Sequence, residues 1–586
     1  MDINFDFSDP ARALAKTKRR IVLLSLGRLA LFLSLIAITA VGLAEYNRLL
    51  LLFIPLSFMF VYLILRFNEQ KDREAFILAI AKIKADKKKR LKRELASFDP
   101  GQEFSSKSHP YANDLDLFGE HSLFQLINHT VSKGGKEKLA SWMLSLMDKH
   151  SARQRNLAIT ELSKKEYFLL TYEAIGQAFL KEEKPKEKFY RWLNAPGSWK
   201  KAFWVPMIGG PFAGTFLLFG VLFGYLPFYY LSFFILVGLL VLGLVFRPLL
   251  AAVKAMPNDG DLKTYKYWAQ LLENISFSND SLIALQAPIK NDNFKSSEAL
   301  KTLQQKSFVV QNRMNLMYLI FNLLFWTDFI ILYRLEKWKA KYGYRVQQWK
   351  EVYEEWEAMT SLASFTDEEK LHCEVEWLEK AVLSFQTLKH PLIAPEKCVG
   401  NDFDLPEDKK TILLTGSNMS GKTTFMRTIG INLVLTGMGL SPMATRFSTG
   451  EFHLYTSMRN IDSLGESVSS FYAELARIKG LLKLASQDKP VFFLLDEILK
   501  GTNTRDRIMG SEALIRQLSE TPAKGIISTH DIELSELENT LPTLVNYSFH
   551  HKIEENEIHF DYKLKSGACP DFNAQKLMEL MGIRLL

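Results

Sequence analysis

The sequence predicts a C-terminal α/β domain that follows an α-helical region with membrane-spanning helices. Two observations predict this fold. Long stretches near the N-terminus and in the middle of the chain are almost free of charge. Residues 411–439 have the pattern of a buried strand, a glycine-containing loop and a helix, which is the repeating unit of a parallel α/β sheet. With 586 residues, the chain is long enough to form both parts.

The composition alone excludes few functions. The formal net charge of +8 permits binding to nucleic acid or anionic lipid and requires neither. Cys373, Cys398 and Cys569 are far apart and lack C-x-x-C spacing. This spacing argues against a disulfide framework or a zinc site and fits a reducing compartment.

A first membrane hairpin is predicted in residues 1–66. Residues 21–44 are apolar apart from Arg28, and residues 49–65 carry no charge. Each run is close to the ~20 residues that cross a bilayer. Only residues 45–48 separate the two runs, so they are expected to form a tight helical hairpin.

A second hairpin is predicted in residues 202–246, which carry no charge and are about two spans long. Gly224-Tyr225-Leu226-Pro227 supplies a turn near the middle. Four spans in two hairpins place both termini on the same side of the membrane. Residues 67–201 follow on that side as well.

Positive charge indicates which side this is. The basic residues on the side of the termini are Lys16, Lys18, Arg19, Arg20, Arg66, Lys71, Arg73, Lys200, Lys201 and Arg247. The outer turns contain one basic residue, Arg48. We therefore expect a multi-pass protein of the inner or plasma membrane, with both termini and the C-terminal domain in the cytoplasm. The lysine-rich segment 67–106 is interpreted as a juxtamembrane helix at lipid headgroups, in preference to a nucleic-acid-binding helix.

A further apolar run, residues 314–333, has the length of a span. Asn315, Asn322 and Asp328 would be costly in lipid. An odd number of spans would also place the C-terminal domain outside the cytoplasm. We therefore predict a buried core helix here, with a helix that touches the membrane as the alternative.

The stretch LLTGSNMSGKTTF, residues 413–425, has the spacing G-x-x-x-x-G-K-[ST] of a phosphate-binding loop. Its glycines let backbone N–H groups close around phosphate oxygens at a helix N-terminus. Lys422 would reach the β and γ phosphates during catalysis, and the Thr423 hydroxyl would bind Mg2+. The residues predicted to hold the nucleotide are Gly416, Ser417, Asn418, Met419, Ser420, Gly421, Lys422, Thr423 and Thr424. The predicted fold class is thus an α/β P-loop NTPase domain, with ATP and Mg2+ as cofactors.

Two later strands complete the predicted site. The strand in VFFLLDEI ends in Asp496 and Glu497. Asp496 suits a contact to Mg2+, and Glu497 suits orienting or deprotonating the attacking water. The strand GIIST is followed by His530, which we expect to sense or polarise the γ phosphate.

These segments resemble the MutS family of mismatch-repair ATPases. The resemblance is carried by TGSNMSGKTTFMR at residues 415–427, SVSSFYAEL at 467–475, LLDEILKGTNTRD at 494–506 and STHDIELSEL at 528–537. It implies an ATPase domain of the ABC or MutS type in residues 390–586. A weaker resemblance in residues 109–144 implies a helical core in residues 107–201 and 247–389, interrupted by the second hairpin.

The resemblance also implies a homodimer in which each ATP site is shared. The partner would supply Ser469, from the serine-containing segment, to the γ phosphate. Leu499 and Lys500 replace a glycine and an arginine of the family pattern. Cys398 stands where many members place an aromatic residue against the adenine.

Members that read mismatches carry an N-terminal Phe-x-Glu wedge. Phe67-Asn68-Glu69 matches it literally but sits at a membrane exit, so we interpret the match as coincidence. We expect a membrane-anchored ATPase with at most sequence-independent binding of duplex DNA. The alternative is a mismatch-repair or recombination protein that binds mismatched or branched DNA. An ABC-type exporter is a poorer candidate, since the sequence lacks L-S-G-G-Q.

Overall fold

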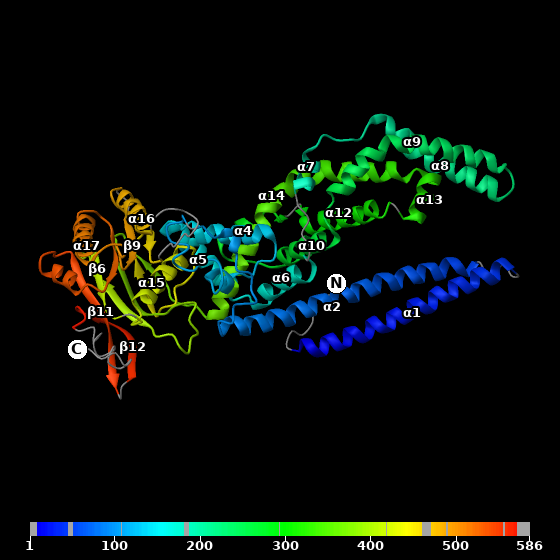
Figure 1. Cartoon of the computed structure of the whole chain (residues 1–586). Coiled ribbons are helices and arrows are strands. Elements are labelled where there is room, and N and C mark those ends of the chain that lie inside the picture. The colour runs from blue at the N-terminus through cyan, green and yellow to red at the C-terminus, as the bar shows by residue number, and fades with distance from the viewer. Residues whose placement is uncertain are drawn as a thin grey trace. The chain divides into compact units, whose positions relative to one another are not determined.

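A computed structural model describes residues 9–44, 51–106, 108–180, 187–291, 294–313, 315–417, 419–459, 470–487, 490–554 and 557–570. The chain forms two compact units. Unit 1 comprises Met1–Asp86, Thr130–Gly135 and Lys165–Thr360. Unit 2 comprises Lys87–His129, Lys136–Lys164 and Ser361–Leu586. Figure 1 shows the elements of both units along the chain.

Unit 2 contains the α/β domain that the sequence predicts. Its main sheet has the strand order β12-β11-β6-β10-β9-β8. The bounds are β6 (Thr411–Thr415), β8 (His453–Ser457), β9 (Val491–Asp496), β10 (Lys524–Thr529), β11 (Leu544–Glu554) and β12 (Glu557–Ser566). Neighbouring strands are parallel except for the antiparallel pair of β11 and β12. Strands β6, β10 and β9 are neighbours and run parallel, so the carboxyl ends of these three motif-bearing strands lie at the same end of the sheet.

The apolar strands of this sheet pack against helices, which explains their continuous hydrophobic runs. The helices are α15 (Lys422–Gly437), α16 (Ser470–Ala485), α17 (Thr504–Ser519) and the 3-10 helix η4 (Ile532–Asn539). Leu481, Leu495 and Ile515 are fully buried in one core cluster. A second sheet has the order β3-β7-β4-β5, with β3 (Val375–Trp377), β4 (Leu383–Leu388), β5 (Asn401–Leu405) and β7 (Arg446–Thr449).

The predicted core segment 107–201 is divided between the two units. Residues 136–164 lie in unit 2, where they form most of α4 (Lys133–Leu144) and all of α5 (Lys149–Ser163). Residues up to 129 also lie there, including α3 (Leu123–Ile127). The Thr456 N–H donates to the Pro110 carbonyl at 2.9 Å, and the Thr456 hydroxyl donates to Asp114 at 2.7 Å. Residues 110–114 are therefore attached to strand β8 of the main sheet.

Unit 1 is helical. Its helices are α1 (Pro10–Ala44), α2 (Phe53–Leu91, which extends beyond the unit), α6 (Glu166–Phe179), α7 (Glu187–Asn194), α8 (Trp204–Leu222), α9 (Phe228–Ala255), α10 (Asp259–Asn274), α11 (Asp280–Gln286), α12 (Ser296–Gln311), α13 (Leu316–Phe325) and α14 (Thr327–Glu369, which also extends beyond it). A short hairpin of β1 (Lys290–Asn291) and β2 (Phe294–Lys295) precedes α12.

Helices α1 and α2 form an antiparallel pair, as the first predicted hairpin requires. The rings of Phe32 and Phe60 lie 6.3 Å apart, and the Arg28 guanidinium lies 4.4 Å from the ring centre of Phe67. Helix α2 is continuous, so the end of the predicted second span and the basic juxtamembrane segment are one helix. Leu91 ends this helix.

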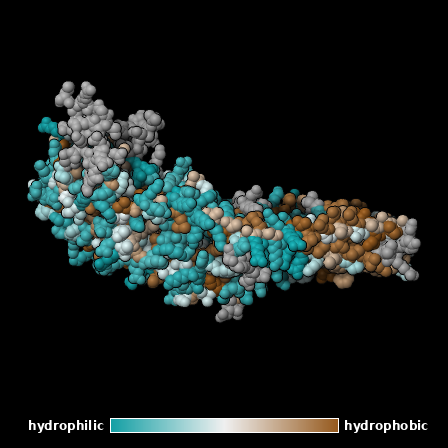
Figure 2. Space-filling view, turned by 90° about the horizontal axis from the view of Figure 1, so that it is seen from below, coloured by the Kyte–Doolittle hydropathy of each residue, from teal (hydrophilic) through white to brown (hydrophobic). Residues whose placement is uncertain are grey.

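Helices α8 and α9 form the second predicted hairpin. Gly224 has φ +75°, and the N–H groups of Tyr225 and Leu226 both donate to the Gly220 carbonyl. The turn therefore lies where the sequence predicts it, while α9 continues past the predicted end at residue 246 to Ala255. Figure 2 shows apolar residues, in brown, gathered at one end of unit 1.

Three helical segments in the described residues are long and apolar enough to cross a membrane: Pro10–Gly42, Lys201–Leu222 and Phe228–Ala255. The second predicted span, residues 49–65, is not among them. The described part of that run is α-helical from Phe53, and Arg66 follows directly after Leu65. Within the described residues, the α-helical apolar part is therefore shorter than the ~20 residues of a span.

The prediction of one buried core helix in residues 314–333 is wrong. The run forms α13 and the start of α14, which are bent by 94° relative to each other at Trp326. The Asn322 side chain accepts hydrogen bonds from the Asp328 N–H and the Thr327 hydroxyl, so it caps the start of α14. Leu316 is 71% exposed, which is not the burial of a core position. If this bent pair is counted as one span, the described residues contain up to four.

Candidate nucleotide-binding site

The phosphate-binding loop connects the fully buried strand β6 to the N-terminus of α15. Gly416 has φ +149°, and a Cβ added there would lie 2.7 Å from the Phe549 carbonyl oxygen. Gly421 has φ +107° and is the N-cap of α15. Both positions need glycine because a side chain would clash or strain the backbone. The loop thus leads into the N-terminal end of a 16-residue helix, which favours anions.

Lys422 is the first residue of α15, and its side chain folds over the loop. It is 5% exposed, and its ammonium donates to the carbonyls of Gly416 at 2.7 Å and Ser417 at 3.0 Å. Burial lowers the pKa of Lys422, although the carboxylates of Glu497 and Asp496 oppose this shift. A buried cation at the mouth of the loop fits the phosphates of a nucleotide.

Thr423 and Asp496 lie together, as a shared Mg2+ site requires. The Thr423 hydroxyl donates to Asp496 Oδ2 at 2.7 Å, and the Ser528 hydroxyl donates to Asp496 Oδ1. Asp496 ends β9 directly beside Ser528 on β10. Mg2+ is commonly held by one or two protein oxygens together with substrate phosphates. Thr423 and Asp496 are therefore the residues that would hold Mg2+.

Glu497 follows β9 in a left-handed conformation, with φ +50°. Its N–H donates to the Ser528 carbonyl at 3.1 Å, which holds this strained position. Its carboxylate contacts Nε2 of His530 and lies 2.5 Å from the Lys500 ammonium. Burial raises the pKa of Glu497, but the hydrogen bonds from His530 and Lys500 outweigh burial and lower the pKa to about 2. Glu497 is therefore ionised at neutral pH.

A cavity of about 460 Å3 joins these groups. Predicted residues that line it are Ser417, Met419, Ser420, Gly421, Lys422, Thr423, Thr424 and Glu497, and Cys398 lines it as well. Gly416 and Asp496 hydrogen-bond to the side chains of Lys422 and Thr423, and His530 reaches Glu497. Asn418 and Ser469 lie outside the described residues. A volume of this size suits a small-molecule ligand.

Tyr562 also lines this cavity, and the sequence analysis missed it. It lies on β12, and its carbonyl accepts a hydrogen bond from the Asn401 side chain at 3.0 Å. A Cβ added to Gly421 would lie 3.2 Å from the Tyr562 ring, so the ring lies next to the phosphate loop. An aromatic ring here offers a stacking surface for a base. No local motif marks Tyr562, because only the pairing of β12 with β11 brings it to the site.

Glu474 is a second residue that the sequence analysis missed. It lies on α16, within the serine-containing segment 467–475, and its carboxylate accepts a hydrogen bond from the Leu499 N–H. Leu499 has φ +60°, so this contact holds another left-handed position close to Glu497. Burial raises the pKa of Glu474. Helix α16 is thereby connected to the segment that carries Glu497.

Comparisons with known proteins find similarity in the part of the chain that contains this site. Residues 412–583 match the model of the family described as MutS domain V. The DNA mismatch repair protein MutS of Staphylococcus haemolyticus (strain JCSC1435) is 29% identical over 250 residues, and that of Staphylococcus aureus (strain JH9) is 28% identical over 250 residues. Each alignment covers 42% of this chain and 28% of the relative, so the chain spans less than a third of the length of these relatives. The C-terminal part of the chain is thus similar to the ATPase domain of the MutS family, and this similarity supports a relationship to that family.

Proposed function

We propose that this protein is a membrane-anchored MutS-like ATPase that binds and hydrolyses ATP with Mg2+ in a site shared by two subunits of a homodimer. The observation that carries the proposal is the convergence of Lys422, Thr423 and Glu497 on one cavity, with Asp496 bonded to Thr423. These groups come from two separate segments of the chain, residues 422–423 and 496–497. Hydrolysis in the dimer would drive a conformational change.

Each residue has a distinct role in this proposal. Lys422 and the loop N–H groups bind the phosphates, and Thr423 and Asp496 hold Mg2+, which neutralises phosphate charge when bound. Glu497 orients the attacking water, and His530 holds its carboxylate from one side. A carboxylate with a pKa of about 2 is a weak base. Weaker contacts with His530 or Lys500 would make this carboxylate a stronger base.

The membrane part of the proposal rests on the apolar helices of unit 1. Helices α1, α8 and α9 contain segments long and apolar enough to span a bilayer, among the described residues. Basic residues flank these segments mainly on the side of the termini. The proposed location is the inner or plasma membrane, with both termini and the ATPase domain in the cytoplasm.

The shared site is tested by mixing two inactive variants. In a heterodimer of Lys422→Ala and Ser469→Ala subunits, one site carries both defects and the other carries neither. We therefore expect the mixture to hydrolyse ATP faster than the sum of the two variants alone. The measurement is steady-state phosphate release after the subunits have exchanged.

The matched control is a mixture of Lys422→Ala with Glu497→Gln. Lys422 and Glu497 line the same cavity within one chain. In this heterodimer, one site therefore lacks Lys422 and the other lacks Glu497. We expect no recovery in the control. Equal rates in the two mixtures would show that each subunit works without a serine from its partner.

A second candidate function is mismatch repair or recombination. The observation that favours it is the similarity to two relatives that are DNA mismatch repair proteins MutS. The wedge-like Phe67 lies under the Arg28 guanidinium, and Arg66 and Glu69 form an ion pair at 3.0 Å. These contacts within the first hairpin favour a structural role for Phe67-Asn68-Glu69 and argue for the first proposal.

We expect the protein to bind matched and single-mismatch duplexes with less than about a tenfold difference, which is about 1.4 kcal/mol. Any affinity for DNA would come from lysines and arginines that contact the phosphates of the DNA backbone. This affinity would fall as the salt concentration rises. The measurement is a titration of the purified protein with both duplexes at two salt concentrations. A larger mismatch preference that disappears in Phe67→Ala would support the repair function instead.

A further inference from the structure

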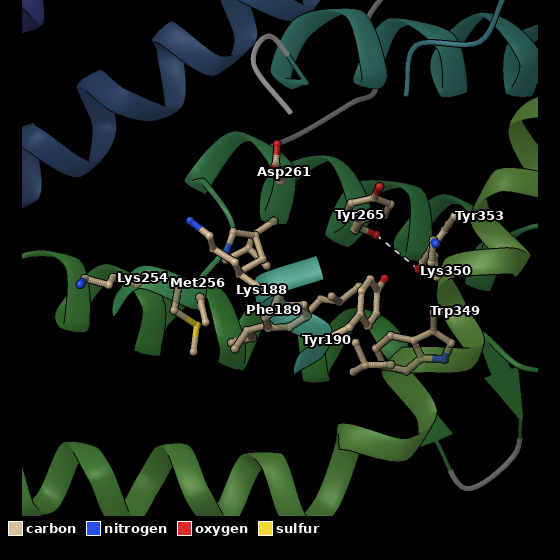
Figure 3. Close-up of a pocket in the computed structure, with 16 residues that line it drawn as sticks. Lys188, Phe189, Tyr190, Lys254, Met256, Asp261, Tyr265, Trp349, Lys350 and Tyr353 are labelled. Atoms are coloured by element: carbon tan, nitrogen blue, oxygen red, sulfur yellow. Dashed lines mark hydrogen bonds between the residues drawn. The ribbon is translucent and has the colours of Figure 1, made fainter. Parts of the chain in front are cut away.

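Unit 1 contains a second cavity, of about 500 Å3, that is separate from the nucleotide site. Side chains from α7, α9, α10, α12 and α14 line it, as Figure 3 shows for most of them. The interior is apolar and aromatic, with Phe189, Met256, Leu303, Trp349 and Tyr353 all buried. Such a lining binds hydrocarbon or an aromatic group rather than a polar metabolite.

The lining also contains charged groups, and most of them are basic. Lys188, Lys254 and Lys350 line the cavity with exposed side chains. The Lys350 ammonium lies 5.9 Å from the ring centre of Tyr190, another lining residue. Among the described residues, Asp261 is the single carboxylate in the lining, and it is buried. The exposed charges at this cavity are therefore positive, which complements an anionic group.

The cavity lies at the end of a candidate membrane span. Helix α9 contains the apolar segment Phe228–Ala255, and its last two residues, Lys254 and Ala255, line the cavity together with the next residue, Met256. Lysine at the end of a span extends its ammonium toward the polar headgroups. Basic pockets at such positions are suited to the headgroups of anionic lipids.

We propose that this cavity binds one anionic phospholipid. An acyl chain would lie against the aromatic interior, and the phosphate would lie at Lys188, Lys254 and Lys350. The inference rests on the membrane anchoring proposed above, but not on ATP hydrolysis. A free phosphate compound would use the lysines and leave the apolar interior without a partner, so the two parts of the lining together favour a lipid.

The test uses the full-length protein purified in detergent. The probes are phosphatidylglycerol and phosphatidylcholine that carry the same fluorescent acyl chain, and the readout is fluorescence anisotropy. We expect phosphatidylglycerol to bind about tenfold more tightly or better. Replacing Lys188, Lys254 and Lys350 together by alanine should remove this preference. The control variant is Lys341→Ala. Lys341 is an exposed lysine on α14, the helix that also carries Lys350, and it does not line the cavity.

A second variant tests the apolar part of the site. Leu303→Trp should fill the cavity and weaken binding of both labelled lipids, whereas the triple lysine variant should weaken only the anionic one. The lysine variant keeps the test decisive even if Leu303→Trp lowers thermal stability, since the three lysines are exposed. Equal binding of both lipids by the parent protein would overturn the inference.

Inorganic phosphate and glycerol 1-phosphate identify the source of the anion. If either displaces the labelled lipid at the lipid's own concentration, the cavity is a site for a soluble phosphate and the lipid proposal is wrong. Alkaline extraction of membranes tests anchoring separately. Release of the protein by alkali would refute the anchoring, whereas retention without lipid preference would refute only the lipid site.

Discussion

Glu497→Gln is expected to bind ATP and to hydrolyse it about 10²–10³-fold more slowly than the parent protein, because a positioned base contributes about this much. The Glu497 carboxylate lines the nucleotide cavity and contacts His530 and Lys500. Glutamine has a similar shape, so the loop and Mg2+ ligands should be unaffected. The neutral amide accepts no proton and attracts Lys500 less strongly. The measurements are single-turnover hydrolysis and equilibrium binding of ATP.

Glu512→Gln is the matched control for this variant. Glu512 is a carboxylate on α17 that pairs with Arg516 at 2.8 Å, away from the cavity lining. The Glu512→Gln variant should hydrolyse ATP at the rate of the parent protein. If Glu497→Gln also kept the parent rate, the water would be oriented by another group and the assignment of Glu497 would be wrong.

Lys422→Ala is expected to weaken ATP binding by about 100-fold or more, which corresponds to about 2.7 kcal/mol. The variant removes a buried cation whose ammonium contacts the carbonyls of Gly416 and Ser417. Without this cation, the carboxylates of Asp496 and Glu497 would repel the phosphates of ATP. The measurement is titration with a fluorescent ATP analogue in the presence of Mg2+.

Lys380→Ala provides the control, since Lys380 is an exposed lysine of unit 2 that pairs with Glu407. It should bind the analogue like the parent. The thermal midpoints of both variants, measured without nucleotide, separate loss of binding from loss of folding. A folded Lys422→Ala protein with parent affinity would contradict the assignment of the phosphate-binding loop.

The sequence alone determined the local parts of the nucleotide site. The phosphate loop needs glycine at positions with positive φ, as found at Gly416 and Gly421, and such a requirement is visible in a single short motif. Apolar runs identified β6 and β9 because a strand covered on both faces has no polar alternation. Charge-free runs likewise identified α8, α9 and the turn at Gly224.

Hydropathy predicted helix boundaries less well where a single side chain determines where a helix begins. The run at 314–333 looks like a single helix, yet the Asn322 side chain caps a new helix at Thr327. Asp328 is buried and is paired with Arg313 at 2.9 Å between Oδ1 and Nε. Average apolarity cannot register such a cap or ion pair. Hydropathy also did not predict the length of helix α2. This helix continues without interruption from the apolar residues of the second predicted span into the basic residues that follow.

Only the tertiary structure brought distant residues to the same place. Tyr562 reaches the phosphate loop because β12 pairs with β11, and Glu474 reaches Leu499 because α16 packs beside the end of β9. The pKa of Glu497 is lowered by its contacts with His530 and Lys500, and His530 comes from a different strand end. Apart from Glu497 and Lys500, which lie three positions apart, these contacts join residues separated by tens of residues or more in the chain. Their positions depend on strand order and packing, which short motifs and periodicity do not specify.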